Sequence, residues 1–222
     1  MTGGEGLRLE ALSLALRGEP LFAPVTLTVP PGRVAAIVGP SGCGKSSLLL
    51  ALCGLLSGPF TVSGEAWIES IPLLQLPPER RKLGLIFQDP LLLPHLSVAE
   101  NLAFGLSAAA GRRGKGERAA AIEEALAQIR LPGYGKRDPA TLSGGQRARV
   151  ALMRSLLAEP RALLLDEAFA SLDAGLRQEM RSFVAAILRE RGLPALLVTH
   201  DQADAEALAE QQVELAFVQQ NT

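Results

Sequence analysis

Short apolar runs are followed by one segment of helical length in the first third of the chain, and this pairing begins an alternation of strands and helices. Three of these runs have the length and apolar content expected of strands, namely Arg8–Leu14, Leu21–Val29 and Arg33–Val38. Pro30-Pro31-Gly32 predicts a tight turn before the third run. The segment from Ser46 to Leu56 has the length and composition of a helix, so a strand-to-helix turn is predicted between residues 38 and 46.

The final third shows the same alternation. It predicts strands at Ala162–Leu165, Ala195–Thr199 and Val213–Val218, and helices at Ala174–Arg191 and Gln202–Gln211. Alternation of this kind requires a mainly parallel core sheet with helices packed against it. The pattern therefore predicts an α/β fold.

The middle of the chain interrupts this pattern. Leu83–Phe87 still resembles a strand, but the segment from Asp89 to about Leu157 is mostly helical. Within it, Glu117–Arg130 has apolar residues at helical spacing between charges, which is typical of an amphipathic packing helix. We predict a single domain over residues 1–222, with a core formed by residues 1–88 and 158–222 and a helical lobe formed by about residues 89–157.

Composition narrows the class of protein. The net charge is −1 over 222 residues, which does not favour an extended nucleic-acid footprint. The longest uncharged stretch, Ser46 to Gly64, is interrupted by Ser57-Gly58-Pro59, and the first five residues lack the basic cluster and apolar core of a signal peptide. Cys43 and Cys53 form neither a disulfide framework nor a metal site. We therefore expect a cytoplasmic protein.

A glycine-rich loop carries the first candidate chemistry. It reads Gly39-Pro40-Ser41-Gly42-Cys43-Gly44-Lys45-Ser46 and lies on the predicted strand-to-helix turn. Its glycines allow backbone amides to close around a phosphate chain, and the helix N-terminus adds partial positive charge. Lys45 can reach the terminal phosphates, the Ser46 hydroxyl can ligate Mg²⁺, and Ser47 is a further candidate phosphate contact.

A pair of carboxylates ends the predicted strand at residues 162–165. Asp166 and Glu167 are adjacent, so at a strand end their side chains point to opposite faces and cannot serve the same role. We assign Asp166 to the Mg²⁺ shell and Glu167 to orienting and polarising an attacking water. The alternative is that both are solvated residues that cap the strand.

A second glycine-containing string, Leu142-Ser143-Gly144-Gly145-Gln146, opens a helical segment that runs to about Glu159. Its amides and hydroxyl form another anion-binding helix terminus. One chain cannot easily bring both helix ends to the same phosphate.

Taken in order, these motifs resemble those of the ATP-binding subunit of an ATP-binding cassette (ABC) transporter of the bacterial importer type, and the resemblance covers nearly the whole chain. Three further strings carry it: Ile86-Phe87-Gln88-Asp89, Ser171-Leu172-Asp173 and Val198-Thr199-His200-Asp201. The family fold is that of a P-loop NTPase, with a mainly parallel core sheet, an antiparallel β part and an inserted α-helical lobe.

The resemblance implies an Mg²⁺-dependent ATPase with ATP and Mg²⁺ as cofactors. It places Gln88 beside the metal or lytic water, His200 near the γ-phosphate and Asp173 among the nucleotide contacts. It also implies a head-to-tail dimer, in which each copy completes the partner's ATP site with its signature segment, Ser143, Gly144, Gly145 and Gln146.

Further expectations follow for partners and location. The chain would sit on the inner face of the cell membrane and bind integral membrane permease subunits through the region from Gln88 to about Asn101. An extracytoplasmic solute-binding protein would complete the complex, nucleic acid would not be a partner, and import is favoured. The alternative is an ABC ATPase that acts as a mechanical regulator of a membrane or cell-wall complex without moving solute.

Three departures from the family pattern limit these expectations. Ser13–Glu19 contains no aromatic residue to contact adenine, so we expect weak discrimination between ATP and GTP. Ala168 replaces the proline that commonly follows the catalytic glutamate. The sequence ends at Thr222, so no appended regulatory domain is expected.

Overall fold

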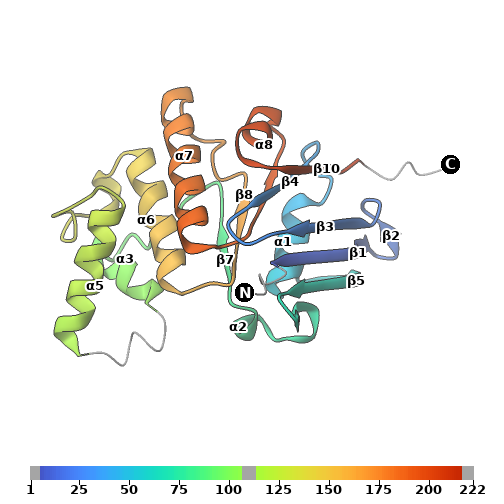
Figure 1. Cartoon of the computed structure of the whole chain (residues 1–222), viewed down its shortest axis with the longest axis horizontal. Helices are drawn as coiled ribbons and strands as arrows, with labels where there is room; N and C mark the ends of the chain where they lie inside the picture. The colour runs from blue at the N-terminus through green and yellow to red at the C-terminus, as the bar shows by residue number, and fades with distance from the viewer. Residues whose placement is uncertain (1–5, 107–113, 217–222) are drawn as a thin grey trace.

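A five-stranded parallel sheet forms the centre of the molecule in the computed structural model, which describes residues 6–106 and 114–216 (Figure 1). Its strands, in spatial order, are β10 (Gln211–Glu214), β4 (Val34–Val38), β9 (Ala195–Thr199), β8 (Ala162–Asp166) and β7 (Leu83–Ile86). All neighbouring pairs in this sheet are parallel. The mainly parallel core sheet predicted from the sequence is confirmed.

A second, antiparallel sheet covers one side of this core. It comprises β1 (Leu7–Leu16), β2 (Glu19–Pro20), β3 (Val25–Val29), β5 (Phe60–Ile68) and β6 (Ile71–Pro72). Between β1 and β2, Arg17 and Gly18 have φ angles of 53° and 89°. Positive φ at both central residues is the geometry of a two-residue hairpin turn, which fixes the register of Leu16 opposite Glu19.

Helices lie on both faces of the parallel sheet. Helix α1 (Lys45–Cys53) packs between the two sheets, where Leu48, Leu49 and Leu52 are fully buried. Helices α7 (Ala174–Arg191) and α8 (Gln202–Leu208) cover the other face. An apolar cluster fills each face of the sheet, one around α1 and the other beneath α7 and α8. Successive strand residues point to opposite faces, so Leu164 belongs to the first cluster and Leu163 to the second.

Three further helices gather at one end of the molecule (Figure 1). They are α3 (Val98–Gly105), α5 (Lys115–Gln128) and α6 (Gly144–Leu157), with a short 3₁₀ turn at Pro139–Thr141. Helices α3 and α6 approach so closely that a Cβ on Gly105 would lie 2.1 Å from the Arg154 carbonyl oxygen. The apolar core of these helices continues into that beneath α7, and the exact boundaries of a separate lobe stay a prediction.

Several predicted boundaries were wrong. The predicted helix from Ser46 to Leu56 ends at Cys53, because Gly54 adopts a left-handed φ of 74° and caps it. The strand predicted at 21–29 begins only at Val25. The final strand is Gln211–Glu214 rather than 213–218, and positions 217–218 of that prediction lie outside the described residues.

A buried arginine anchors the far end of α1. Arg81, in the short helix α2 (Pro78–Arg81), donates hydrogen bonds to the carbonyl oxygens of Ala51, Leu52 and Leu76. Ala51 and Leu52 lie in the last turn of α1, and the Ala51 carbonyl also accepts a 3.0 Å hydrogen bond from the Gly54 N–H. Burial also raises the pKa of the neighbouring Cys53 thiol to about 11, although the positive charge of Arg81 opposes the shift.

Over the two described stretches, no helix combines the length and apolar character needed to cross a lipid bilayer.

Candidate functional site

Three neighbouring strands of the parallel sheet end at the same edge, and each is followed by a predicted site residue. The register pairs Val38 of β4 with Thr199 of β9, and Asp166 of β8 with Val198. The glycine-rich loop (residues 39–46), the carboxylate pair and His200 therefore leave the sheet side by side. Ligands of open parallel sheets bind at this edge.

The glycine-rich loop is held by its own lysine. Lys45 is only 4% exposed, and its Nζ donates hydrogen bonds of 2.8 Å to the carbonyl oxygens of Gly39 and Pro40. Gly42 and Gly44 have φ angles of 83° and 97°, in the region that favours glycine. The loop thus curls around a buried ammonium group at the start of α1.

Ser46 and Asp166 form an oxygen pair at the base of the loop. The Ser46 hydroxyl donates a 2.9 Å hydrogen bond to Asp166 Oδ1. Burial raises the pKa of the Asp166 carboxyl, and the hydrogen bond from Ser46 partly opposes this shift. Hydroxyl and carboxylate oxygens are the ligands that Mg²⁺ prefers, so the pair fits this cation.

Glu167 has other partners than Asp166. Its Oε2 lies 3.0 Å from His200 Nδ1, and its Oε1 lies 3.9 Å from Lys45 Nζ. Its backbone has a φ of 48°, which is uncommon for a residue with a Cβ and is found at functional sites where surrounding contacts hold it. Here the Glu167 N–H donates to the Val198 carbonyl.

Lys45, Ser46 and Glu167 line one cavity of about 270 Å³, called here the loop cavity, whereas Asp166 and His200 contact this lining through Ser46 and Glu167. It is lined by Leu16, Leu21, Ser41, Gly42, Gly44, Lys45, Ser46, Ser47, Phe60 and Glu167. Sequence reasoning missed three apolar lining residues, Leu16, Leu21 and Phe60. Phe60 was missed because strand β5 was not predicted, and no motif marks Leu16 or Leu21. Cys43 does not line it, since its side chain is buried in the apolar cluster beneath the loop.

The signature segment lies elsewhere in the same chain. Ser143 caps α6 by accepting a hydrogen bond from the Gln146 N–H, while Gln146 Oε1 accepts one from the Ser143 N–H. Gly145 is buried, and a Cβ there would lie 2.5 Å from a Leu176 methyl group. None of the four signature residues lines the loop cavity.

Gln88 is also outside the loop cavity. It is exposed and lines a separate hollow of about 120 Å³ together with Gly144 and Leu172. The Ser171 hydroxyl donates a 3.4 Å hydrogen bond to the Gln88 carbonyl. Asp173 has a local role, since it caps α7 by accepting a hydrogen bond from the Leu176 N–H.

An arginine joins the segments that follow β8 and β9. Arg177 of α7 forms an ion pair with Asp201 and donates a 3.1 Å hydrogen bond to the Ala170 carbonyl. Asp201 in turn caps α8 through the Ala203 N–H. The residues next to Glu167 and His200 are therefore braced against one helix.

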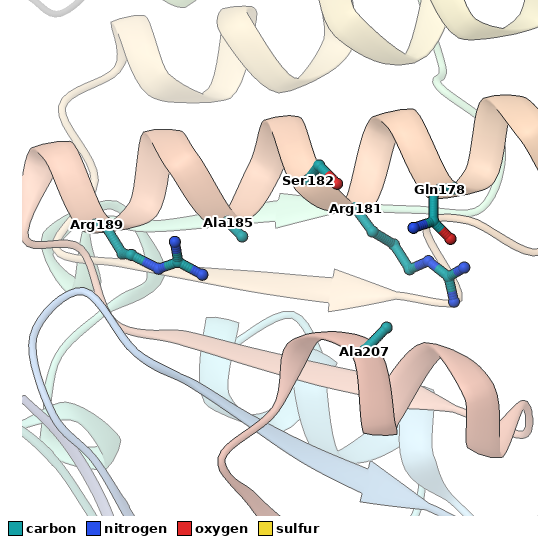
Figure 2. A pocket seen from close by; sticks show the side chains of 6 residues that line it. All are labelled: Gln178, Arg181, Ser182, Ala185, Arg189 and Ala207. Atoms are coloured by element: carbon teal, nitrogen blue, oxygen red, sulfur yellow. The ribbon is translucent and has the colours of Figure 1, made fainter.

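A different hollow of about 220 Å³ lies between α7 and α8 (Figure 2). It is lined by Gln178, Arg181, Ser182, Ala185, Arg189 and Ala207. Arg181 pairs there with Asp204, whose carboxyl has a pKa raised by burial. None of the motif residues faces this hollow, so we place the functional site at the loop cavity.

Comparisons with known proteins point to one family. A family model described as ABC transporter matches residues 22–170. An uncharacterised ABC transporter ATP-binding protein, YnjD of Escherichia coli, is 43% identical over 201 residues, which is 90% of this chain and 91% of that protein.

The sulfate/thiosulfate import ATP-binding protein CysA of Gloeobacter violaceus is 43% identical over 183 residues, which cover 82% of this chain but 52% of that protein. The chain thus spans about half the length of this import relative. Among solved structures, cbiO1 from Clostridium perfringens, described as part of the ABC transporter complex cbiONQ, has a TM-score of 0.81. It is 26% identical, and the match covers 96% of this chain and 85% of that one.

Proposed function

The chain belongs to the ABC transporter family, and we propose that it is the Mg²⁺-dependent ATPase of a solute importer that works with separate membrane subunits. The observation that carries the proposal is that Lys45, Ser46 and Glu167 line one cavity. Asp166 stands behind Ser46 through a hydrogen bond, and His200 contacts Glu167. The import relative supports the direction of transport.

ATP binding uses the glycine-rich loop. The ammonium group of Lys45 exchanges its carbonyl partners for phosphate oxygens, and the amides at the start of α1 contact the same phosphates. Ser46 and Asp166 would hold Mg²⁺, which would supply positive charge to offset that of the phosphates. Gln88 would add a ligand when the loop that carries it moves toward the cavity.

Hydrolysis requires an oriented water molecule next to the γ-phosphate. Glu167 faces the cavity and accepts the proton of this water, which is general-base catalysis. His200 holds the Glu167 carboxylate through Nδ1 and leaves its other ring nitrogen to contact the γ-phosphate. Ala168 leaves both carboxylates in place.

A second copy of the chain completes the site. The signature segment lies outside its own chain's loop cavity, which supports a head-to-tail dimer rather than a site within one chain. In that dimer Ser143, Gly144, Gly145 and Gln146 would cover the partner's ATP, and Asp173 would lie near the shared interface.

The permease would bind beside the segment that carries Gln88. Leu91 is 52% exposed just after Gln88, and Phe104 on α3 is 73% exposed. Arg154 of α6 donates hydrogen bonds to the carbonyls of Pro90 and Leu91, so this surface is attached to the helix that carries the signature segment. Docking there would hold the chain on the inner face of the membrane, with a solute-binding protein on the other side.

The direct test is Mg²⁺-dependent phosphate release from ATP by the purified chain. Lys45→Ala should abolish nucleotide binding, and Glu167→Gln should preserve binding while removing hydrolysis. Glu190→Gln, a change at an exposed glutamate on α7, is the matched control and should behave as the wild type. Equal hydrolysis by the Glu167 and Glu190 variants would contradict the proposal.

A further inference from the structure

The loop cavity has an apolar wall that phosphate chemistry does not use. Leu16, Leu21 and Phe60 line the cavity together with the glycine-rich loop. Phosphates, Mg²⁺ and water all require polar partners, so such a wall serves none of them. A nucleoside triphosphate also carries a flat base with a π-face suited to aromatic contact. The wall therefore matches the part of the ligand that Lys45 and Ser46 do not bind.

Phe22, the aromatic residue nearest in sequence to the β1–β2 hairpin, cannot make this contact. Its side chain is 1% exposed, and a Cβ on Gly44 would lie 3.0 Å from its ring. Phe22 is thus packed beneath the glycine-rich loop. Phe60 is partly exposed, and it is the one aromatic residue among the described residues that line the cavity.

The backbone around Phe60 is well fixed. Phe60 is the first residue of β5 and pairs with Leu16 of β1. Its N–H donates a 2.9 Å hydrogen bond to the Gly58 carbonyl, and the Arg17 N–H donates one of 2.9 Å to the Pro59 carbonyl. A backbone fixed by these pairings leaves only the side-chain torsions of Phe60 to be ordered when a ligand stacks on the ring.

We propose that Phe60 is the platform on which the base of the bound nucleotide stacks, with Leu16 and Leu21 contacting its edges. This inference rests on the proposed ATPase function and names a contact within the same site. Stacking on an aromatic ring tolerates any base, because every base has a π-face. The platform therefore gives affinity for purine nucleoside triphosphates while choosing weakly between ATP and GTP.

The experiment compares three probes by titration calorimetry without Mg²⁺, so that no hydrolysis occurs: ATP, GTP and inorganic tripolyphosphate. Phe60→Ala should weaken ATP and GTP binding by a similar factor of about 5- to 100-fold and leave tripolyphosphate binding unchanged. Phe60→Trp should bind as the wild type. Phe60→Leu, which keeps apolar bulk without an aromatic face, should lose part of the affinity.

Leu55→Ala is the control, since Leu55 is 55% exposed and does not line the loop cavity. Unchanged ATP binding by Phe60→Ala, in a wild type that does bind ATP, overturns the role of Phe60 and leaves the proposed function intact. Equal losses for ATP and tripolyphosphate also overturn it, because they indicate a damaged loop. A wild type that binds neither ATP nor tripolyphosphate overturns the proposed function and the Phe60 platform with it.

Discussion

His200 Nδ1 lies 3.0 Å from Glu167 Oε2, so the residues that follow two adjacent strands meet at the loop cavity. The contact orients the carboxylate that faces the cavity, and it uses one ring nitrogen of the histidine. The other nitrogen stays free to meet a ligand. Glu167 and His200 should therefore act together in ATP hydrolysis. Replacing Glu167 and replacing His200 should nevertheless change the hydrolysis kinetics in different ways.

Glu167→Gln should slow ATP hydrolysis by about 10²- to 10⁴-fold, because an amide cannot accept the proton of the attacking water. ATP should then remain bound and hold two copies together. Light scattering with ATP and Mg²⁺ should detect dimers of this variant. Only monomers under these conditions would contradict the shared site at Ser143–Gln146.

His200→Ala should lower kcat by about 10²-fold with a smaller effect on KM, because it frees the Glu167 carboxylate and removes a γ-phosphate contact. His200→Gln should recover part of this loss, since its amide can still donate to Glu167. Steady-state ATPase kinetics would distinguish the two variants. Identical rates for both would mean that the hydrogen bond to Glu167 has no role.

Asp166→Asn should raise the thermal stability of the nucleotide-free protein while abolishing Mg²⁺-dependent hydrolysis. Burial raises the pKa of the Asp166 carboxyl, so its ionised form at pH 7 opposes folding. Each kcal/mol recovered corresponds to about 2–4 °C in the melting temperature of a chain of this size.

The pH dependence of this effect has a defined sign. A raised carboxyl pKa favours the folded wild type at low pH, and this advantage is lost as pH rises from about 4, the usual value for aspartate, through the raised pKa. The melting temperature of the variant should therefore exceed that of the wild type by more at pH 7.5 than at pH 4.5. A constant difference would exclude Asp166 ionisation as its cause.

Arg81→Met should destabilise the fold by about 1–3 kcal/mol, because it removes the guanidinium donor to the Leu52 carbonyl and one of two donors to the Ala51 carbonyl. Methionine keeps the apolar stem and removes the guanidinium group. Denaturant unfolding of this variant would be compared with Arg80→Met, which alters the exposed neighbour on α2. Equal unfolding midpoints would show that the α1 carbonyls find other partners.

Gly105→Ala should separate α3 from α6, since the new Cβ would lie 2.1 Å from the Arg154 carbonyl oxygen. We expect a loss of about 1–3 kcal/mol of stability, as in other overpacked helix contacts. Gly116→Ala on α5 is the control, because a Cβ there meets nothing within 4 Å. This second change should stabilise the protein by up to about 1 kcal/mol through helix propensity.

The polar half of the candidate site could be predicted because its residues follow recognisable local patterns. Lys45 and Ser46 come directly after the glycine-rich loop, and Glu167 and His200 end apolar runs. Parallel strands then bring these ends to one edge of the sheet. The mainly parallel sheet itself was predictable from the same alternation.

The apolar half could not be found in this way. Phe60 follows Ser57-Gly58-Pro59, and the strand that it begins contains Gly64 and several polar residues, so its alternation is weak. Its place in the cavity depends on pairing with Leu16, far away in the sequence. The end of α1 is a different case. A glycine after a helical segment is the usual signal for a helix C-terminus, so Gly54 could have corrected the predicted end at Leu56.

Helix α6 connects two surfaces that different molecules would occupy. Ser143 begins it, and Arg154, about 16 Å further along the axis, holds the carbonyls of Pro90 and Leu91. A tilt of about 10° around the first turn would carry those two residues some 3 Å sideways, roughly the width of one atom. In the proposed complex, the displacement passed to the permease would scale with the length of α6, and a shorter α6 should reduce it in proportion.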